Sequence, residues 1–212
     1  MARPKLFGAD YSVYVRIVRL TLAQKGIDCD LVPVDIFAEG GPPAWYADMH
    51  PFGRIPSFEH DGLRLIETTA ISRYVDEAFA GESLQPADPR CRAVMNQIIS
   101  MLDSYAYRTL VWDIYVERVS KPARGERPDE ELIASAVGKA RTFLSCLDRL
   151  KAPGPWLLGD KITLADLHAA PMFGYFTKAA ESIDLMSAHP ALGQWWERMR
   201  ALPSFQATEP SD

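Results

Sequence analysis

Apolar and polar positions alternate in short segments over the first eighty residues of the chain. The pattern predicts strands at Lys5–Phe7 and Leu31–Asp35, helices at Ser12–Lys25 and Pro43–Met49, a hairpin around Asp61-Gly62, and a helix from Thr69 to about Phe79. In that last helix the residues on one face at helical spacing are Ile71, Tyr74, Val75 and Ala78. This order of strands and helices favours a small mixed sheet with helices on both faces.

After about residue 90 every periodic segment is typical of a helix. The first is long, and a seam with alternating spacings of four and three comprises Val94, Ile98, Met101, Tyr105, Arg108, Trp112, Tyr115 and Val119. Asp88 with Pro89 is a typical helix start. A second helix is expected from about Asp129 to Leu150, and a last one opens at Pro190. Another begins at Thr163, because Thr163 and Asp166 have the spacing of a capping box.

These two patterns predict an α+β protein with two domains. Residues 1–80 form a thioredoxin-like domain with the order βαβ-α-ββα, residues 81–89 are a linker rich in turn residues, and residues 90–212 form an all-helical domain.

The segment His50–Phe58 carries the first candidate for chemistry. A proline inside a strand cannot donate to the ladder, so Pro56 must lie at an edge or at a strand entrance. If the Ile55-Pro56 bond is cis, the chain turns there and leaves the backbone N–H and C=O of Ile55 facing outward. An extended ligand could then pair with Ile55 as an additional strand.

The residues that follow complete a cradle for a small zwitterionic peptide. Asp61-Gly62 is a strong hairpin signal, and Thr68 starts the next helix, where unpaired backbone N–H groups favour a carboxylate. Glu67, one residue earlier, could pair with a ligand ammonium.

This run closely resembles the second half of the glutathione-binding domain of glutathione S-transferases, and the resemblance extends over nearly the whole chain. It implies that Ile55, before a cis Pro56, pairs with the cysteinyl backbone of glutathione. It also implies that Glu67 and Thr68 hold the γ-glutamyl amine and carboxylate. Arg54 could bind the glycyl carboxylate or the cysteinyl carbonyl region of glutathione, or it is a solvated surface arginine. The His-Lys pair that phi members use for the glycyl carboxylate is missing.

Ser12 is the candidate that activates the glutathione thiol. It follows the first strand and begins a helix in the run Asp10–Arg16, which looks like the serine-type signature of the phi, tau and theta branches. A hydroxyl that donates to the sulfur near a helix N-terminus would favour the thiolate. An ordinary N-cap is the alternative role for Ser12. Tyr11 is the competing hydroxyl.

For the second substrate, the resemblance implies an apolar electrophile or a peroxide, bound in a pocket between the two domains. Candidates for its lining are Tyr11, Phe37, Tyr107, Arg108, Trp112 and Tyr115. An aromatic core or a dimer seam is the alternative for each of the aromatic residues. Arg108 is unusual on an apolar seam, so it is expected to face the site or to pair with an acidic group.

Composition narrows the classes of function. A net charge of −5 argues against a nucleic-acid partner, and no apolar run approaches the length of a membrane span. The three cysteines are widely spaced and the four histidines show no metal-ligand spacing, so neither a disulfide framework nor a metal site is expected.

The sequence therefore predicts a glutathione transferase with glutathione as co-substrate and no prosthetic group. A homodimer and a cytoplasmic location are expected from the resemblance. The alternative is a related binding or scaffold module without turnover, and retention of both Ser12 and Glu67-Thr68 favours the enzyme.

Overall fold

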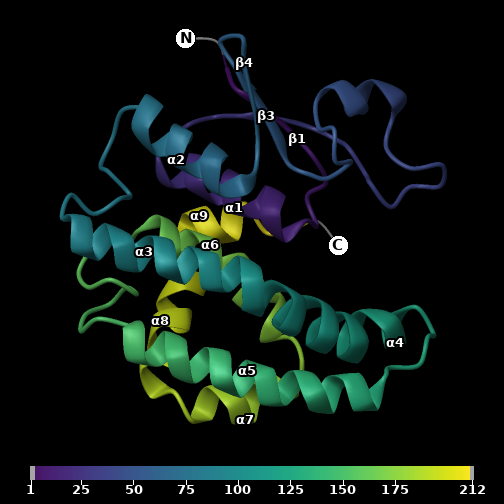
Figure 1. Cartoon of the computed structure of the whole chain (residues 1–212), viewed down its shortest axis with the longest axis vertical. Helices are drawn as coiled ribbons and strands as arrows, with labels where there is room; N and C mark the ends of the chain where they lie inside the picture. Colours follow the sequence, from purple (N-terminus) through teal and green to yellow (C-terminus); the bar gives the residue numbers. More distant parts are fainter. Residues whose placement is uncertain (1–2, 211–212) are drawn as a thin grey trace. The chain divides into compact units, whose positions relative to one another are not determined.

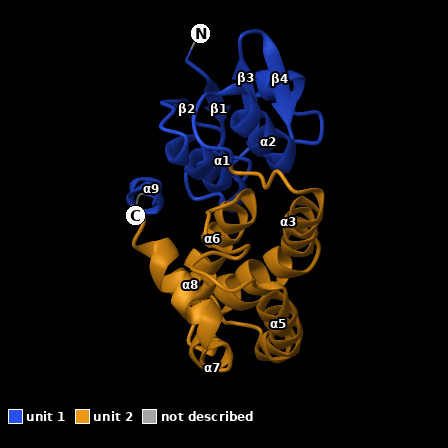
Figure 2. Cartoon of the chain, turned by 90° about the vertical axis from the view of Figure 1, so that its left-hand side faces the viewer, with its two compact units in different colours: residues 1–83, 203–212 blue, residues 84–202 orange. Residues whose placement is uncertain are grey.

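A computed structural model describes residues 3–210, which form two compact units (Figure 2). One unit comprises the chain up to Ser83 together with the segment from Pro203, and the other comprises Leu84–Leu202. We expected the helical domain to include the C-terminal segment, but α9 (Pro203–Ala207) belongs to the first unit. The reason is a buried contact: the Arg16 guanidinium lies 4.0 Å from the centre of the Phe205 ring and donates to the Phe205 carbonyl at 3.1 Å.

The first unit contains the mixed sheet that the sequence predicts (Figure 1). Its strand order is β2-β1-β3-β4, from the strands β1 (Lys5–Phe7), β2 (Asp30–Val32), β3 (Ser57–His60) and β4 (Leu63–Ile66). β1 pairs parallel with β2 and antiparallel with β3, which pairs antiparallel with β4. β2 ends before the predicted Asp35 because Pro33 has no N–H to continue the ladder.

The hairpin between β3 and β4 turns at Asp61-Gly62, as predicted. The φ angles of these two residues are 46° and 82°, and two consecutive positive values define a type I′ turn. This turn places Ile66 opposite Ser57 and brings the end of β4 next to the start of β3.

Three helices complete this unit: α1 (Val13–Gln24), the short η1 (Ala44–Asp48) and α2 (Thr68–Ala78). α1 packs against α2. One hydrophobic cluster joins the sheet to these helices, and its fully buried members include Leu6, Val15, Val18, Tyr46, Phe58, Ile71 and Val75. The apolar face predicted for α2 is thus confirmed for Ile71 and Val75.

The second unit is helical, as predicted (Figure 1). α3 (Pro89–Met101), the π-type η2 (Leu102–Ser120) and α4 (Lys121–Ala123) follow one another without a break. α5 (Glu130–Leu150) and α6 (Leu164–Phe176) both pack on η2, and α7 (Glu181–Ser187) and α8 (Pro190–Arg200) follow. The cap at Asp88 is confirmed, since its carboxylate accepts the Cys91 N–H at 2.8 Å.

The predicted seam on the long helix is correct at Ile98, which is fully buried, but wrong in its register from Leu102 onward. The buried positions there include Leu102, Ala106, Leu110 and Ile114, and Met95 is buried before them, whereas Tyr105 is 65% exposed. Both series repeat at intervals of three or four residues, so periodicity alone could not separate them. The aliphatic series fits the space between α5 and α6, and the larger aromatic side chains lie at its margins.

The predicted capping box at the start of α6 is confirmed, with Thr163 at the N-cap and Asp166 at N3. Nearly the whole of α6 is buried, which makes it the central helix of its unit. Within residues 3–210, none of the helices has the length and apolar character needed to cross a membrane.

Candidate functional site

Ser12 lies where the chain leaves β1 and enters α1. Gly8 precedes it in a left-handed conformation with φ of 157°, and a Cβ there would lie only 2.4 Å from Cγ2 of Val15. A larger residue at Gly8 would therefore push α1 away from the strand. Ser12 caps α1, because its Oγ accepts the Val15 N–H at 3.4 Å. This bond uses the oxygen as acceptor and leaves the hydroxyl hydrogen available to a ligand, so the cap and the proposed catalytic role are compatible.

Tyr11 is held by the loop that follows β2. Its hydroxyl donates to Oδ1 of Asp35 at 2.5 Å, and the same oxygen accepts the backbone N–H of Phe37 at 2.8 Å. The Tyr11 hydrogen bond, followed by that of Phe37, lowers the pKa of Asp35. A phenol has one proton to donate, and Asp35 accepts it. Ser12 is therefore the better placed of the two candidate donors to a thiolate.

The Ile55-Pro56 peptide bond is cis, as the sequence predicts. Ile55 is buried and lies just before β3, outside the ladder. Tyr46, which the sequence reasoning missed, supports this segment from η1. Its fully buried hydroxyl donates to the Arg54 carbonyl at 2.9 Å and lies 3.0 Å from Oγ of Ser57. Only its position in the predicted helix Pro43–Met49 could have drawn attention to it.

Glu67 occupies the N-cap of α2 with φ of 71° and ψ of 112°. A non-glycine residue in this region costs on the order of 1–3 kcal/mol, and such residues cluster at functional sites. The Glu67 side chain is exposed and makes no capping hydrogen bond, and Thr68 beside it is buried. The first N–H groups of α2 therefore remain available for an anion.

Arg54 carries a positive charge, opposite to that of the Glu67 carboxylate. Among residues 3–210 the side chains of Arg54 and Glu67 enter no hydrogen bond or ion pair. Both influence one buried ring, since Glu67 raises and Arg54 lowers the pKa of His50. One cation and one anion close to the same side chain, each without a partner in the described chain, match a ligand that carries both charges.

His50 is a further residue whose place in the site the sequence does not reveal, because the spacing of the histidines bears only on metal binding. Only 3% of it is exposed, and its Nδ1 has no hydrogen-bond partner within the described residues. Burial is the main cause of its lowered pKa. Its ring lies 6.1 Å from that of Phe52 and 6.4 Å from that of Tyr46.

The remaining candidates divide between the two units. Tyr11 and Phe37 lie in the first unit with their rings stacked, 6.4 Å between centroids. Tyr107, Trp112 and Tyr115 are half-buried on η2, and Tyr115 packs on Tyr175 of α6 at 4.7 Å between ring centroids. Burial raises the pKa of Tyr115.

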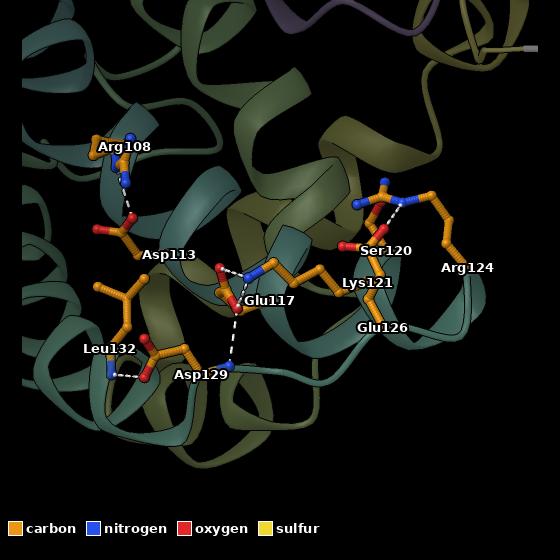
Figure 3. A network of polar contacts seen from close by, with 9 residues as sticks. All are labelled: Arg108, Asp113, Glu117, Ser120, Lys121, Arg124, Glu126, Asp129 and Leu132. Atoms are coloured by element: carbon orange, nitrogen blue, oxygen red, sulfur yellow. Dashed lines mark hydrogen bonds and ion pairs between the residues drawn. The ribbon is translucent and has the colours of Figure 1, made fainter.

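Arg108 pairs with an acidic group, which is one of the two outcomes that the sequence left open. Its Nε donates to Oδ1 of the buried Asp113 at 2.7 Å (Figure 3), and 70% of the Arg108 side chain is exposed. A separate set of bonds lies further along η2, where Glu117 accepts from Nζ of Lys121 at 2.7 Å and from the N–H of Asp129 at 2.9 Å (Figure 3). These bonds tie η2 to the start of α5, which is a structural role.

Comparison with known proteins adds independent information. The family model described as "Glutathione S-transferase, N-terminal domain" matches residues 6–83, and that described as "Glutathione S-transferase, C-terminal domain" matches residues 130–198.

Similarity to individual proteins extends over almost the full length. The chain is 32% identical to glutathione S-transferase PM239X14 of Arabidopsis thaliana, over 96% of this chain and 94% of that protein. It is 30% identical to a glutathione S-transferase of Hyoscyamus muticus, over 95% of each. The solved structure of glutathione S-transferase III in apo form superposes with a TM-score of 0.86 at 28% identity, covering 100% of this chain and 99% of that one.

Proposed function

The chain belongs to the glutathione S-transferase family and is a glutathione transferase, and from this premise we propose how its residues bind and activate glutathione. Ile55 pairs with the cysteinyl backbone of the tripeptide next to the cis Pro56. Glu67 binds the γ-glutamyl ammonium, and the N–H groups at Thr68 bind the γ-glutamyl carboxylate. The observation that carries this assignment is the strained Glu67, whose carboxylate has no capping bond to the helix that it begins.

Ser12 donates its hydroxyl hydrogen to the sulfur of bound glutathione and so stabilises the thiolate. A free thiol has a pKa of about 8.5 and is mostly protonated at neutral pH. One donor near the N-terminus of α1 would lower that pKa by one to two units, which corresponds to about 1.5–3 kcal/mol. Ser12 stays protonated throughout and forms no covalent bond. The thiolate then attacks an apolar electrophile or a peroxide.

The decisive experiment titrates the ultraviolet absorbance of the glutathione thiolate on the protein from about pH 5 to 9. In the wild type we expect a depressed thiol pKa, which returns toward about 8.5 in Ser12→Ala. Ser12→Thr keeps a hydroxyl and a capping oxygen, so it should retain part of the depression. This variant separates thiol activation from the loss of a helix cap, which costs about 1 kcal/mol in Ser12→Ala.

Tyr11→Phe is the matched control, because the Tyr11 proton is donated to Asp35. Its bound thiol should titrate as in the wild type. If the depression survives in Ser12→Ala and disappears in Tyr11→Phe, the assignment is wrong and Tyr11 is the activating residue. Saturable glutathione binding without any depression would favour a binding module.

Arg54 is proposed to bind the glycyl carboxylate, since the chain has no His-Lys pair for it. Arg54→Gln should then weaken binding of glutathione about tenfold and leave the affinity for γ-glutamylcysteine, which has no glycine, almost unchanged. Calorimetric titration of both ligands measures this. Equal losses for the two would remove the glycyl contact from the proposal.

We further propose that Tyr11 and Phe37, and from η2 the residues Tyr107, Arg108, Trp112 and Tyr115, contribute to the binding of the electrophile. A homodimer and a cytoplasmic location complete the proposal, and both follow from the family. Sedimentation should give twice the 23.7 kDa mass of one chain, and cell fractionation should recover the protein with cytoplasmic markers. A single-chain mass would contradict the dimer.

A further inference from the structure

Asp35 has no role in the glutathione site proposed above, yet it joins two segments next to Ser12. It follows β2, and its Oδ1 accepts both the Tyr11 hydroxyl at 2.5 Å and the Phe37 N–H at 2.8 Å. Tyr11 is 24 residues away in the sequence. Because one oxygen atom receives both donors, the start of α1 and the loop after β2 are fixed with respect to each other.

The two residues that Asp35 joins carry exposed aromatic rings. Tyr11 is 38% exposed and Phe37 is 65% exposed, and their rings lie nearly parallel, with 28° between their planes and 6.4 Å between their centroids. Offset stacking of this kind is a favourable arrangement of two aromatic rings. The pair offers an apolar aromatic surface adjacent in the chain to the residue assigned to the thiolate.

The charge on Asp35 strengthens both bonds. Hydrogen bonds to an ionised carboxylate are shorter and stronger than those between neutral groups. The donors from Tyr11 and Phe37 lower the pKa of Asp35, so the carboxylate stays ionised over the neutral range. The link from the Tyr11 hydroxyl to the Phe37 backbone therefore persists under the conditions in which a glutathione thiolate reacts.

We propose that Asp35 is a positioning residue for the second substrate: by holding Tyr11 and Phe37 as one aromatic surface, it favours electrophiles that carry a planar aromatic group over aliphatic ones. A flat ring can extend the stack on the exposed Phe37 ring, whereas an aliphatic chain gains less from a fixed aromatic face. This inference rests on the proposed function, because it requires thiolate transfer in the same unit.

Benzyl and allyl isothiocyanate make a matched pair of probes. In both, the glutathione sulfur forms a bond to the central carbon of the N=C=S group, the C=N π electrons move to nitrogen, and nitrogen takes a proton from water. The product is a dithiocarbamate. The reacting group is identical, so only the aromatic or aliphatic substituent distinguishes the two substrates.

The experiment measures kcat and KM for both isothiocyanates in the wild type and in Asp35→Ala. We expect Asp35→Ala to raise KM for the benzyl compound about threefold to tenfold, with kcat nearly constant, and to raise KM for the allyl compound less than twofold. Tyr11→Phe keeps the ring and loses only the Tyr11 bond, so it should change the selectivity in the same direction and by no more than Asp35→Ala. The double variant should lose no more than Asp35→Ala alone, because the Tyr11 bond is one of the two that Asp35→Ala already removes.

Two further variants test whether the change in selectivity depends on hydrogen bonding by Asp35 or follows from the loss of any nearby aspartate. Asp35→Asn retains an oxygen that can accept both donors, so it should restore most of the benzyl preference. Asp30→Ala removes another exposed aspartate of the same strand region, one that pairs with Arg3, and should not alter the selectivity.

Equal losses for both substrates in Asp35→Ala, or additive losses in the double variant, would overturn the role of Asp35. Failure of the proposed function has a different signature, because the wild type would then show no depressed thiol pKa and no turnover of either compound.

Discussion

Two helices of this protein begin beside an acidic residue, and the two beginnings are opposite in character. At the start of α6, Asp166 is fully buried, and its carboxylate accepts four hydrogen bonds. The donors are the Leu157 and Thr163 N–H groups, the Thr163 hydroxyl and the Trp195 indole, all within 2.8–2.9 Å. At the start of α2, Glu67 is exposed, has a positive φ and makes no capping bond.

The difference distinguishes a residue that stabilises the fold from a residue that we propose binds a ligand. A buried carboxylate with every donor in place holds its surroundings together, and losing it leaves several polar groups without partners. A strained residue whose charge has no protein partner makes no comparable contribution to the free energy of unfolding. In the proposed site, this conformation presents the carboxylate to the ammonium group of glutathione. Burial raises the pKa of Asp166, and its four donors oppose that effect.

Asp166→Ala should have the largest effect on stability. We expect a loss of about 3 kcal/mol or more in the free energy of unfolding, because four buried donors lose their acceptor. Denaturant titration followed by tryptophan fluorescence measures it, since Trp195 itself donates to Asp166. The exposed Asp160→Ala is the control and should change stability by less than about 0.5 kcal/mol. A loss below about 1 kcal/mol in Asp166→Ala would contradict the comparison.

Glu67→Gln tests the proposed ligand-binding role of Glu67 at the start of α2. It preserves the size of the side chain and removes the charge, so affinity for glutathione should fall about 10-fold to 100-fold while the unfolding free energy stays within about 0.5 kcal/mol. Calorimetric titration with glutathione gives the affinity. Glu77→Gln, at an exposed position further along α2, is the control. Unchanged affinity would show that Glu67 does not bind the ammonium.

Glu67→Gly sharpens the comparison by isolating strain. Glycine adopts positive φ without steric cost, so this variant should be about 1 kcal/mol more stable than Glu67→Ala, which retains the strained backbone. Both variants should lose affinity for glutathione. Thermal or denaturant unfolding of the pair measures the difference, and equal stabilities would mean that the backbone at Glu67 is relaxed.

His50 gives the smallest expected effect. Burial lowers the pKa of His50 in the folded protein below its ordinary value of about 6.5, so the unfolded chain binds the imidazole proton more readily. The contribution of His50 to stability should therefore be complete above about pH 6.5. It should be lost as the pH falls from about 6.5 toward the pKa of His50 in the folded state. His50→Asn should reduce this dependence. Denaturation midpoints of the wild type and His50→Asn at about pH 5.5 and 7.5 measure this dependence. The same change of midpoint with pH in both proteins would contradict the prediction.

Local signals in the sequence were sufficient for several parts of the fold. Asp61-Gly62 specified the hairpin because two consecutive residues that tolerate positive φ define its turn. Thr163 and Asp166 specified the start of α6 because a capping box uses groups within four residues of one another. The cis Pro56 and the charged Glu67 were also visible, since the run that contains them is contiguous.

Contacts between distant segments could not be predicted in the same way. The buried face of η2 depended on which of two equally periodic series fits between α5 and α6. The bond from Tyr11 to Asp35 and the contact from Arg16 to Phe205 join segments whose separation in the chain carries no local pattern.

The sequence by itself determined the order of the strands and of the longer helices, the starts of those helices and the contiguous run that matches a glutathione site, because each depends on neighbours in the chain. Only the tertiary structure decided which charges lack protein partners. Arg54 and Glu67 have none in the described chain, while Arg108 is paired with Asp113. The physical reason is that a partner for a charge is chosen by distance in space, and folding brings together donors and acceptors that the sequence keeps apart.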